Sequence, residues 1–406
     1  MISGAGVEIH KGLAGVVVDT TSISTVVQQT NSLTYRGYPV EELAESCSFE
    51  EVAWLIWYGE LPTRDALRNF EAHERGQREL SATTLSLLAH LPVACHPMDV
   101  LRTGVSCLGT EDPAGSDTAT NANLGTAVNL YAKLPTIVAF DFRRRRGLDV
   151  IPPNPELGYV DNFLHMCFGR VPDPEITRCF EISLILYAEH GFNASTFTAR
   201  TIASSLSDIY SAVTGAIGAL KGPLHGGANE AVMRMMLEID DPKRAAQWLR
   251  DALAAKAKIM GFGHRVYKHG DSRVPTAKKV LSRMTQVTNE SKWLEMTQIL
   301  EETMLREKGI HPNLDFPTGP AYYLMGFDID MFTSIFVMSR ITGWTAHVIE
   351  QLSDNSLVRP LSSYIGPEQR SVPKADSFRA WKPQSENAFG ASFGGGRVSN
   401  LDHMRT

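Results

Sequence analysis

Apolar residues recur at helical spacing along most of the chain from about residue 40 onward. Residues 173–191 begin with an Asp-Pro pair, carry one apolar face and end at a glycine, which is the usual order of helix start and stop signals. Residues 241–261 repeat this order, and we expect Lys256 and Lys258 in the last turn of that helix. A third apolar face follows Asp330. The pattern predicts an all-α fold.

Extended segments are expected only near the N-terminus. Residues 15–20 and 32–36 have the composition of short strands. At the other end, residues 374–406 are polar, contain three consecutive glycines and show no sustained apolar face. We therefore expect a polar C-terminal tail there, with a composition typical of disorder.

Composition narrows the class of protein. A chain of 406 residues is long enough for two or three domains. Its formal charge of -6 argues against a nucleic-acid scaffold. The five cysteines are odd in number and far apart, so neither a disulfide framework nor a structural zinc site is expected. With no apolar stretch of about 18 residues and no signal-peptide pattern, we predict a cytoplasmic protein.

Histidines and one aspartate gather at predicted helix ends and in loops rich in glycine or proline. The segments are AEHGFNAS, GPLHGGANE, GFGHRVYKHGDSR and HPNLDFPTG. Loops held by rigid helices are where reactive groups concentrate. The sequence contains no phosphate loop, dinucleotide fingerprint, H-E-x-x-H or G-x-S-x-G motif. Its chemistry is therefore sought in these four segments.

His225 lies where a helix is expected to begin, because Gly226 and Gly227 precede an apolar helical face that starts near Asn229. The positive end of a helix dipole disfavours imidazolium. We therefore expect a neutral ring that donates a hydrogen bond to a developing oxyanion. The alternative is a loop histidine that only caps its neighbour.

The segment around His264 combines glycine with a high density of cations. Gly261 and Gly263 flank one aromatic residue, so backbone groups there can approach a planar ligand closely. Four basic residues follow within nine positions of a chain whose net charge is -6: Arg265, Lys268, His269 and Arg273. This density indicates an anionic ligand. A solvated basic loop paired with nearby carboxylates is the alternative.

Asp315 lies between Pro312 and Pro317, in an apolar-flanked loop after a helix stop at Gly309. Desolvation makes a carboxylate more basic, so Asp315 is a candidate general base. An aspartate that only forms a turn is the commoner use of this residue. His190 is a weaker candidate, because a helix C-terminus favours histidine through the dipole alone.

Three arginines could clamp a substrate that carries two or more carboxylates. Arg340 lies within an otherwise apolar helix, where its charge needs a partner, and Arg359 follows that helix. Together with Arg273 they offer planar forks suited to bidentate pairing. We interpret the run Arg143 to Arg146 instead as a solvated face, with weak attraction of a phosphorylated cofactor as the alternative.

In this order, GPLHGGANE, GFGHRVYKHGDSR, PNLD and the final RP resemble the citrate synthase family. The resemblance covers about residues 12–373, and HGFNASTFTAR with PNLDFPTGPAYYLMGFD is similar to the methylcitrate synthase branch. It implies an all-helical homodimer whose subunits have a large and a small domain, with the active-site cleft between them. We expect the large domain to comprise residues 1–226 and 327–373, and the small domain residues 227–326.

The resemblance also implies a reaction, the condensation of an acyl-CoA with oxaloacetate. For this branch the acyl-CoA is propionyl-CoA, with acetyl-CoA accepted as well. The CoA thioester is a substrate, and neither a tightly bound cofactor nor a metal is implied. Asp315 would remove the α-proton of the thioester, His225 would donate a hydrogen bond to the thioester oxygen, and His264 would bind and protonate the oxaloacetate carbonyl.

Substrate binding is implied for a second set of residues. Oxaloacetate would be held by His190, Arg273, Arg340 and, across the homodimer, Arg359 of the partner subunit. Gly261 and Gly263 resemble the adenine-recognition segment of the family. Lys268 occupies a position where relatives carry a cation that contacts CoA.

Three other functions stay open on the sequence alone. A housekeeping citrate synthase would prefer acetyl-CoA, and one methylene is worth only ~1–3 kcal/mol in a pocket. A metal-dependent hydrolase would use the His and Asp residues as ligands, although the usual ligand spacings are absent. A helical interaction module without catalysis would leave the cation-rich glycine segment unexplained.

Overall fold

The computed structural model describes residues 9–13, 15–27, 29–113, 119–267 and 270–372. The predicted CoA-contacting residue Lys268 and the predicted tail at 374–406 lie outside these ranges. Contacts divide the chain into two units. One comprises residues 1–16 and 360–406 and includes a 3₁₀ turn, η1 (Lys11–Leu13). The other, residues 17–359, is called the main unit below and holds all the strands and α-helices assigned in the described residues.

A small antiparallel sheet opens the main unit. In it β1 (Ser24–Val27) pairs with β2 (Ser32–Tyr35), which pairs in turn with β3 (Tyr38–Pro39). The extended segment predicted at 32–36 is confirmed by β2, whereas residues 15–20 form no strand. All four β2 side chains are buried. The sheet is therefore packed into the main unit and can support the residues that contact it.

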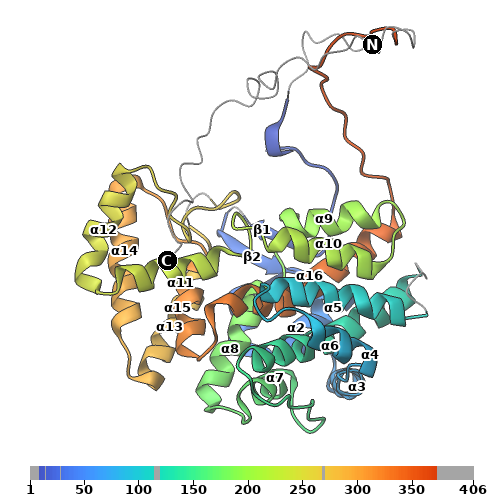
Figure 1. Cartoon of the computed structure of the whole chain (residues 1–406), viewed down its shortest axis with the longest axis horizontal. Helices are drawn as coiled ribbons and strands as arrows, with labels where there is room; N and C mark the ends of the chain where they lie inside the picture. The colour runs from blue at the N-terminus through green and yellow to red at the C-terminus, as the bar shows by residue number, and fades with distance from the viewer. Residues whose placement is uncertain (1–8, 14, 28, 114–118, 268–269, 373–406) are drawn as a thin grey trace, which may run out of the picture. The chain divides into compact units, whose positions relative to one another are not determined.

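The rest of the main unit is helical (Figure 1), which confirms the predicted all-α class. None of the described helices has the length and apolar character that a membrane span requires. The helices are α1 (Val40–Ser46), α2 (Phe49–Tyr58), α3 (Arg64–Arg75), α4 (Ala82–His90), α5 (Pro97–Glu111), α6 (Thr120–Arg145), α7 (Tyr159–Phe168), α8 (Pro174–Tyr187), α9 (Ala194–Ala203), α10 (Ile209–Leu220), α11 (Ala228–Ile239), α12 (Pro242–Ala254), α13 (Val274–Thr288), α14 (Lys292–Lys308), α15 (Asp315–Leu324) and α16 (Phe332–Ser353), with a 3₁₀ turn, η2 (Ile329–Met331), before α16.

Helix starts follow the predicted signals more closely than helix ends. The Asp173 carboxylate accepts the Glu175 N–H at 2.8 Å at the start of α8, which is how an N-cap satisfies a free backbone donor. Asp241 does the same at the start of α12. However, α12 ends at Ala254, so the prediction that Lys256 and Lys258 occupy its last turn is wrong. The reason is local, because Lys256 takes a left-handed conformation with φ of 57° that stops the helix.

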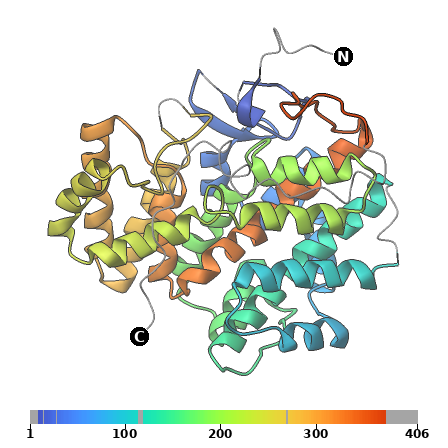
Figure 2. The same ribbon diagram turned by 45° about the horizontal axis from the view of Figure 1, so that its top comes forward.

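Helix α16 is buried along most of its length and confirms the helix predicted after Asp330. It packs against α6, α8, α9 and α10, and Figures 1 and 2 both place it among the other helices. A helix that is apolar on all sides belongs in a core. Its buried charged or titratable side chains, Arg340 and His347, therefore need partners. His347 Nε2 lies 2.9 Å from the carboxylate of Glu189, and both side chains are fully buried.

Replacing Gly343 with alanine is expected to destabilise the protein by about 1–3 kcal/mol or more. Gly343 lies in α16 against Glu189, and an added Cβ would lie 2.1 Å from Glu189 Oε2 and 2.7 Å from the Ala188 carbonyl oxygen. The second neighbour is backbone and cannot move without shifting the segment that leads to His190. The measurement is the free energy of unfolding in urea.

Gly125→Ala is the matched control, because Gly125 is also a helix-interior glycine but an added Cβ there meets nothing within 4 Å. Gly125→Ala is expected to leave the free energy of unfolding unchanged or to raise it by up to about 1 kcal/mol, since alanine is the better helix former. Equal stability of the two variants would contradict the packing argument.

The run Arg143 to Arg146 is not a solvated face, and that interpretation is wrong for its central members. Arg144 and Arg145 pair with the buried carboxylate of Asp141, and their side chains are only 12% and 16% exposed. Arg146 pairs with Asp328 at 2.8 Å. The four arginines also donate to several backbone carbonyl groups. They therefore fasten the end of α6 to neighbouring loops.

Candidate active site

His225 lies in the turn before α11, where the sequence places it. Its Nε2 is 2.8 Å from the Ser195 hydroxyl oxygen and accepts the Ser195 N–H at 3.3 Å. Nε2 also lies 3.1 Å from Asn193 Oδ1, but this oxygen already accepts the Ser195 and Thr196 N–H groups. Because a backbone N–H can only donate, the proton of the neutral ring is assigned to Nδ1. Ser195 is held in turn by Trp344, whose indole N–H donates to its hydroxyl at 3.0 Å. His225 thus presents an Nδ1–H without a hydrogen-bond partner in the described ranges.

The electrostatic state of His225 agrees with the sequence prediction, but its main cause differs. Burial, followed by the positive charge of Arg340, lowers the pKa of His225 to about 3. The dipole of α11, expected from the sequence to keep the ring neutral, is not among these causes. The imidazole is neutral near pH 7, so it can act as a hydrogen-bond donor and not as a charged acid.

His264 and His190 lie side by side, with Tyr267 packed against both. The two imidazole centroids are 4.9 Å apart, and the Tyr267 ring lies 4.7 Å from His264 and 5.4 Å from His190. The Val266 N–H donates to His264 Nδ1 at 3.1 Å, so the proton of neutral His264 is assigned to Nε2. Burial and then the charge of Arg273 lower the pKa of His264 to about 4, and the same causes hold the pKa of His190 well below its usual range.

Asp315 is the first residue of α15, not a residue of the preceding loop as its prolines suggested. The Tyr187 hydroxyl donates to its Oδ1 at 2.7 Å, and Asn313 Oδ1 accepts its backbone N–H at 3.2 Å. Burial raises the pKa of Asp315 to about 6, although the Tyr187 hydrogen bond and the charge of Arg273 oppose this. A carboxylate with such a pKa is a stronger base than an exposed one.

Asp315 is connected to His225 and His264 through shared neighbours. The Tyr187 ring lies 4.2 Å from that of Phe336, which lies 6.4 Å from the His225 ring. The charge of Arg340 lowers the pKa of both His225 and Asp315, and that of Arg273 lowers the pKa of both His264 and Asp315. No hydrogen bond joins Asp315 directly to either histidine among the interactions of the described residues. The structure thus gathers the following predicted residues into one cluster: His190, His225, His264, Arg273, Asp315 and Arg340.

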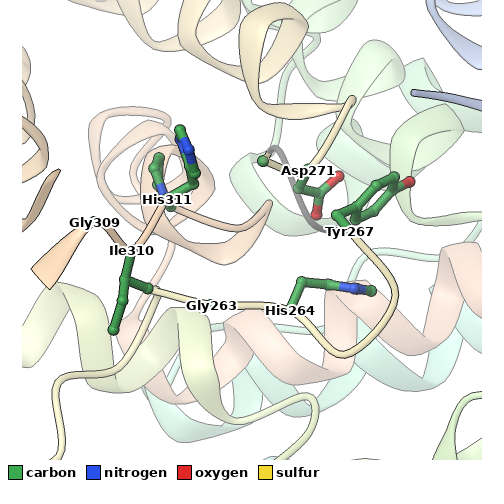
Figure 3. Close-up of a pocket in the computed structure, with 9 residues that line it drawn as sticks. Gly263, His264, Tyr267, Asp271, Gly309, Ile310 and His311 are labelled. Carbon is green, nitrogen blue, oxygen red and sulfur yellow. The ribbon is translucent and has the colours of Figure 1, made fainter. Parts of the chain in front are cut away.

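The loop that carries His264 pairs with the loop before Asp315. The Gly263 N–H donates to the His311 carbonyl at 2.8 Å, and the Asn313 N–H donates to the Gly261 carbonyl at 2.9 Å. Between the two loops is a pocket of about 180 Å³. Figure 3 shows His264, Tyr267 and Asp271 on one side of it and residues 309–311 on the other. The pocket is lined by Gly263, His264, Tyr267, Gly270, Asp271, Gly309, Ile310, His311 and Pro312.

Gly261 and Gly263 are required for the packing of this loop against its neighbours. Gly261 has φ of +86°, and a Cβ there would lie 2.6 Å from Val232 Cγ2, so only glycine fits. The Gly261 carbonyl and the Gly263 N–H are already used in pairing with residues 311–313. Phe262, at the centre of this antiparallel bridge, has its own N–H and C=O directed to the opposite edge. These two groups have no hydrogen-bond partner in the described chain.

The three predicted arginines differ in environment. Arg273 is buried, and its Nε and Nη2 donate to the two carboxylate oxygens of Asp271 at 2.9 and 2.7 Å. Arg340 is buried too, with its Nε donating to the Tyr187 carbonyl at 2.7 Å and its guanidinium 4.8 Å from the Phe336 ring centroid, while neither Nη makes a hydrogen bond in the described residues. Arg359 lies after α16, is exposed, and makes no hydrogen bond or ion pair there. The single chain therefore brings Arg273 and Arg340 to the cluster but not Arg359.

Several residues of the cluster were missed from the sequence. Asp271 is almost fully buried and holds Arg273, and its Asp-x-Arg spacing inside the basic segment was a usable signal. Tyr187 and Ser195 gave no comparable signal, because tyrosine and serine near helix ends are common. In the described ranges no three His, Cys, Asp or Glu side chains converge in a way that could hold a metal ion.

Comparisons with known proteins indicate the family of the chain. The family described as "Citrate synthase, C-terminal domain" matches residues 12–361. The 2-methylcitrate synthase of Mycobacterium tuberculosis is 64% identical over 90% of this chain and 93% of its own length, and a citrate synthase of Mycolicibacterium smegmatis is 60% identical over 90% and 97%. The ternary complex of Thermoplasma acidophilum citrate synthase with carboxymethyl coenzyme A and oxaloacetate matches with a TM-score of 0.86 at 32% identity, over 91% of this chain and 99% of that one. The fold, the ordered motifs and these similarities together show that the chain belongs to the citrate synthase family.

Proposed function

We propose that the chain condenses propionyl-CoA with oxaloacetate and water to give 2-methylcitrate and CoA, and that it also accepts acetyl-CoA to give citrate. The observation that carries this proposal is Asp315, a carboxylate of raised pKa in one cluster with two neutral imidazoles and two buried arginines. The relative at 64% identity named 2-methylcitrate synthase supports the choice of propionyl-CoA. The relative at 60% identity named citrate synthase supports the use of both thioesters.

In the first step Asp315 takes a proton from the α-carbon of the thioester. The electron pair of that C–H bond moves into the thioester carbonyl and forms an enol or enolate. The α-proton is far less acidic than a carboxylic acid, so the developing charge on oxygen must be stabilised. We assign this to the Nδ1–H of His225, and removing one such donor typically costs about 2.7–4 kcal/mol.

In the second step the α-carbon attacks the oxaloacetate carbonyl carbon. His264 donates its Nε2–H to the carbonyl oxygen, which becomes the hydroxyl of the product as the new C–C bond forms. Water then hydrolyses the thioester and releases the CoA thiol. This hydrolysis makes the overall reaction hard to reverse.

Oxaloacetate would be held by His190 and the arginines. The unpartnered Nη groups of Arg340 suit one of its carboxylates. Arg273 is fixed by Asp271 and keeps Nη1, with one long backbone contact of 3.4 Å, for the same purpose. In a homodimer, Arg359 of the partner subunit would complete the clamp, which accounts for its exposure and lack of partners in a single chain.

CoA would bind at the two paired loops. The free N–H and C=O of Phe262, set by Gly261 and Gly263 on either side, are placed to recognise the edge of an adenine ring. Lys268, outside the described residues, would add a cation for the CoA phosphates. We further propose that residues 227–326 form a small domain that closes on residues 1–226 and 327–373, and so excludes water before the thioester reacts.

Thiol release from propionyl-CoA and from acetyl-CoA, each with and without oxaloacetate, tests the function. Release that requires oxaloacetate, with the larger kcat/KM for propionyl-CoA, is the expected result. A larger kcat/KM for acetyl-CoA would make the protein a housekeeping citrate synthase. Release without oxaloacetate would contradict the proposal and indicate a thioesterase. We also propose a cytoplasmic location, which the dispersed cysteines support.

Activity is expected to fall as the pH drops below about 6, because Asp315 must be ionised to accept a proton. Its pKa is raised to about 6, so the protonated form accumulates below that value and log kcat/KM declines with a slope of about 1. Tyr187→Phe removes a hydrogen bond that lowers this pKa, so its acid limb is expected at higher pH. An acid limb at the same pH in both enzymes would argue against Asp315 as the base.

A further inference from the structure

Tyr267 contacts His190, the histidine proposed to bind the substrate. Neither the motif spacing nor the proposed reaction steps assign Tyr267 a role. The hydroxyl oxygen of Tyr267 lies 3.1 Å from His190 Nε2, and both side chains are buried. Its ring also packs against His264. Tyr267 therefore contacts both of the imidazoles that the proposed function assigns to oxaloacetate (Figure 3 shows it beside His264).

The direction of the hydrogen bonds can be followed from the sheet inward. The backbone N–H of Leu33 in β2 donates to the Ser272 hydroxyl oxygen at 3.2 Å. The Ser272 hydroxyl donates to the Tyr267 oxygen at 3.2 Å. A backbone N–H can only donate, and each hydroxyl has a single proton. The Tyr267 proton is thus left to donate to His190 Nε2.

This direction determines which nitrogen of His190 carries a proton. Burial and the charge of Arg273 keep His190 neutral, so only one ring nitrogen is protonated. If Nε2 accepts from Tyr267, the proton is on Nδ1. His190 Nδ1 makes no hydrogen bond to any residue that the structure describes. It is therefore the nitrogen available to donate to a ligand.

This series of hydrogen bonds starts from a buried part of the molecule. All β2 side chains are buried, and the β1–β2 turn also holds the same loop, because the Asn31 side-chain amide donates to the Gly270 carbonyl at 2.9 Å. A hydroxyl chain that starts from a fixed backbone donor has one favoured direction, whereas an isolated histidine can take either tautomer.

We propose that Tyr267, supported by Ser272 and the Leu33 N–H, is a positioning residue that fixes His190 in the Nδ1–H tautomer and so presents a hydrogen-bond donor to a carboxylate or carbonyl oxygen of the ketodiacid substrate. This rests on the proposed function, in which His190 binds oxaloacetate. Tyr267 acts through His190 and takes no proton from the substrate.

The experiment compares Tyr267→Phe, Ser272→Ala and Tyr58→Phe with the wild-type enzyme. Tyr58 is the control, because it is 45% exposed on α2 and its hydroxyl has no hydrogen-bond partner among the described residues. Tyr267→Phe is expected to raise the KM for oxaloacetate roughly tenfold, the value of about one hydrogen bond. Its kcat and its KM for the acyl-CoA are expected to change less than about threefold. Ser272→Ala should change the oxaloacetate KM in the same direction by less, and Tyr58→Phe should match the wild type.

The second readout is the imidazole ¹⁵N spectrum of histidine-labelled enzyme, with the His190 signals identified by their loss in His190→Gln. The wild type is expected to show His190 protonated on Nδ1, and Tyr267→Phe a mixture of tautomers. His190 protonated on Nε2 in the wild type would overturn the inference. So would an unchanged oxaloacetate KM, or an equal loss in kcat and both KM values, which would indicate general misfolding. Failure of the proposed function is distinguishable, since the wild type itself would then neither bind oxaloacetate nor need it for thiol release.

Discussion

Asp315→Asn is expected to lower kcat by roughly 10²- to 10⁴-fold with propionyl-CoA and with acetyl-CoA. The amide cannot accept the α-proton. Among the described residues, no other carboxylate makes a hydrogen bond with Tyr187, so none occupies the position of Asp315 and could replace it as the base. The KM values are expected to stay within a few-fold, because the amide has nearly the shape of the carboxylate. Its oxygen can still accept the Tyr187 hydroxyl proton, so the side chain should keep its place.

The stability of this variant separates lost chemistry from lost folding. The pKa of Asp315 rises from 3.8 to about 6 on folding, so the folded state favours the protonated carboxyl. That contribution is present at low pH and is lost as the pH rises through about 6. A neutral amide should thus leave the protein at least as stable as the wild type at pH 7, measured as Tm.

The control is Asp65→Asn, because Asp65 is 80% exposed in the first turn of α3 and lies outside the cluster. It is expected to change neither kcat nor Tm appreciably. An Asp315→Asn enzyme with kcat within about tenfold of the wild type would exclude a general-base role. A protein that melts well below the wild type would instead indicate that Asp315 has mainly a structural role.

The helical architecture was predictable because its signals are local. An Asp-Pro start and a continuous apolar face depend on residues within one or two turns of each other, and α8, α12 and α16 all begin where these signals place them. The predicted end of α12 is too late because Lys256 stops the helix in a left-handed conformation. Lysine is not a residue type that signals this conformation in a sequence. The strands β1 and β3 were missed because a short strand is defined by its pairing, and pairing is not local.

The chemistry of the site was predictable only in part. The cluster was indicated by residue types that rarely have a purely structural role. Examples are histidine beside glycine and an arginine inside an apolar helix. The sequence prediction did not include the neighbouring residues that set the orientation, tautomer or pKa of these side chains. Asp271 fixes the orientation of Arg273, Ser195 fixes the tautomer of His225, and Tyr187 lowers the pKa of Asp315. The second and third of these effects depend on a distance between segments far apart in the sequence, whereas Asp271 lies only two residues before Arg273.

The run Arg143 to Arg146 shows the opposite error. A dense basic run in a sequence resembles an exposed patch, but Asp141, one turn earlier on the same helix, neutralises two of its members, and backbone carbonyl groups take up further donors. The apparent charge of a segment is therefore a poor guide to its exposure when an acid lies three or four residues away.

His225→Ala is expected to lower kcat by roughly 10²- to 10³-fold, with little change in the KM for oxaloacetate. The Nδ1–H of this neutral imidazole is the donor proposed to meet the oxygen on which charge develops during enolisation. Alanine removes that donor but leaves Asp315 and the oxaloacetate residues in place. The direct measurement is the exchange of the acyl α-protons with deuterated solvent, which should slow in parallel with kcat.

His73→Ala is a suitable control, because His73 is exposed on α3 and outside the cluster. The decisive comparison is the double variant Asp315→Asn/His225→Ala. If the carboxylate and the imidazole act on one transition state, the double variant should lose much less than the product of the two single losses, because either change alone already disables enolisation. Losses that multiply fully would mean that the two residues act in separate steps, and His225 would then have to be assigned to binding instead of to the enolisation of the thioester.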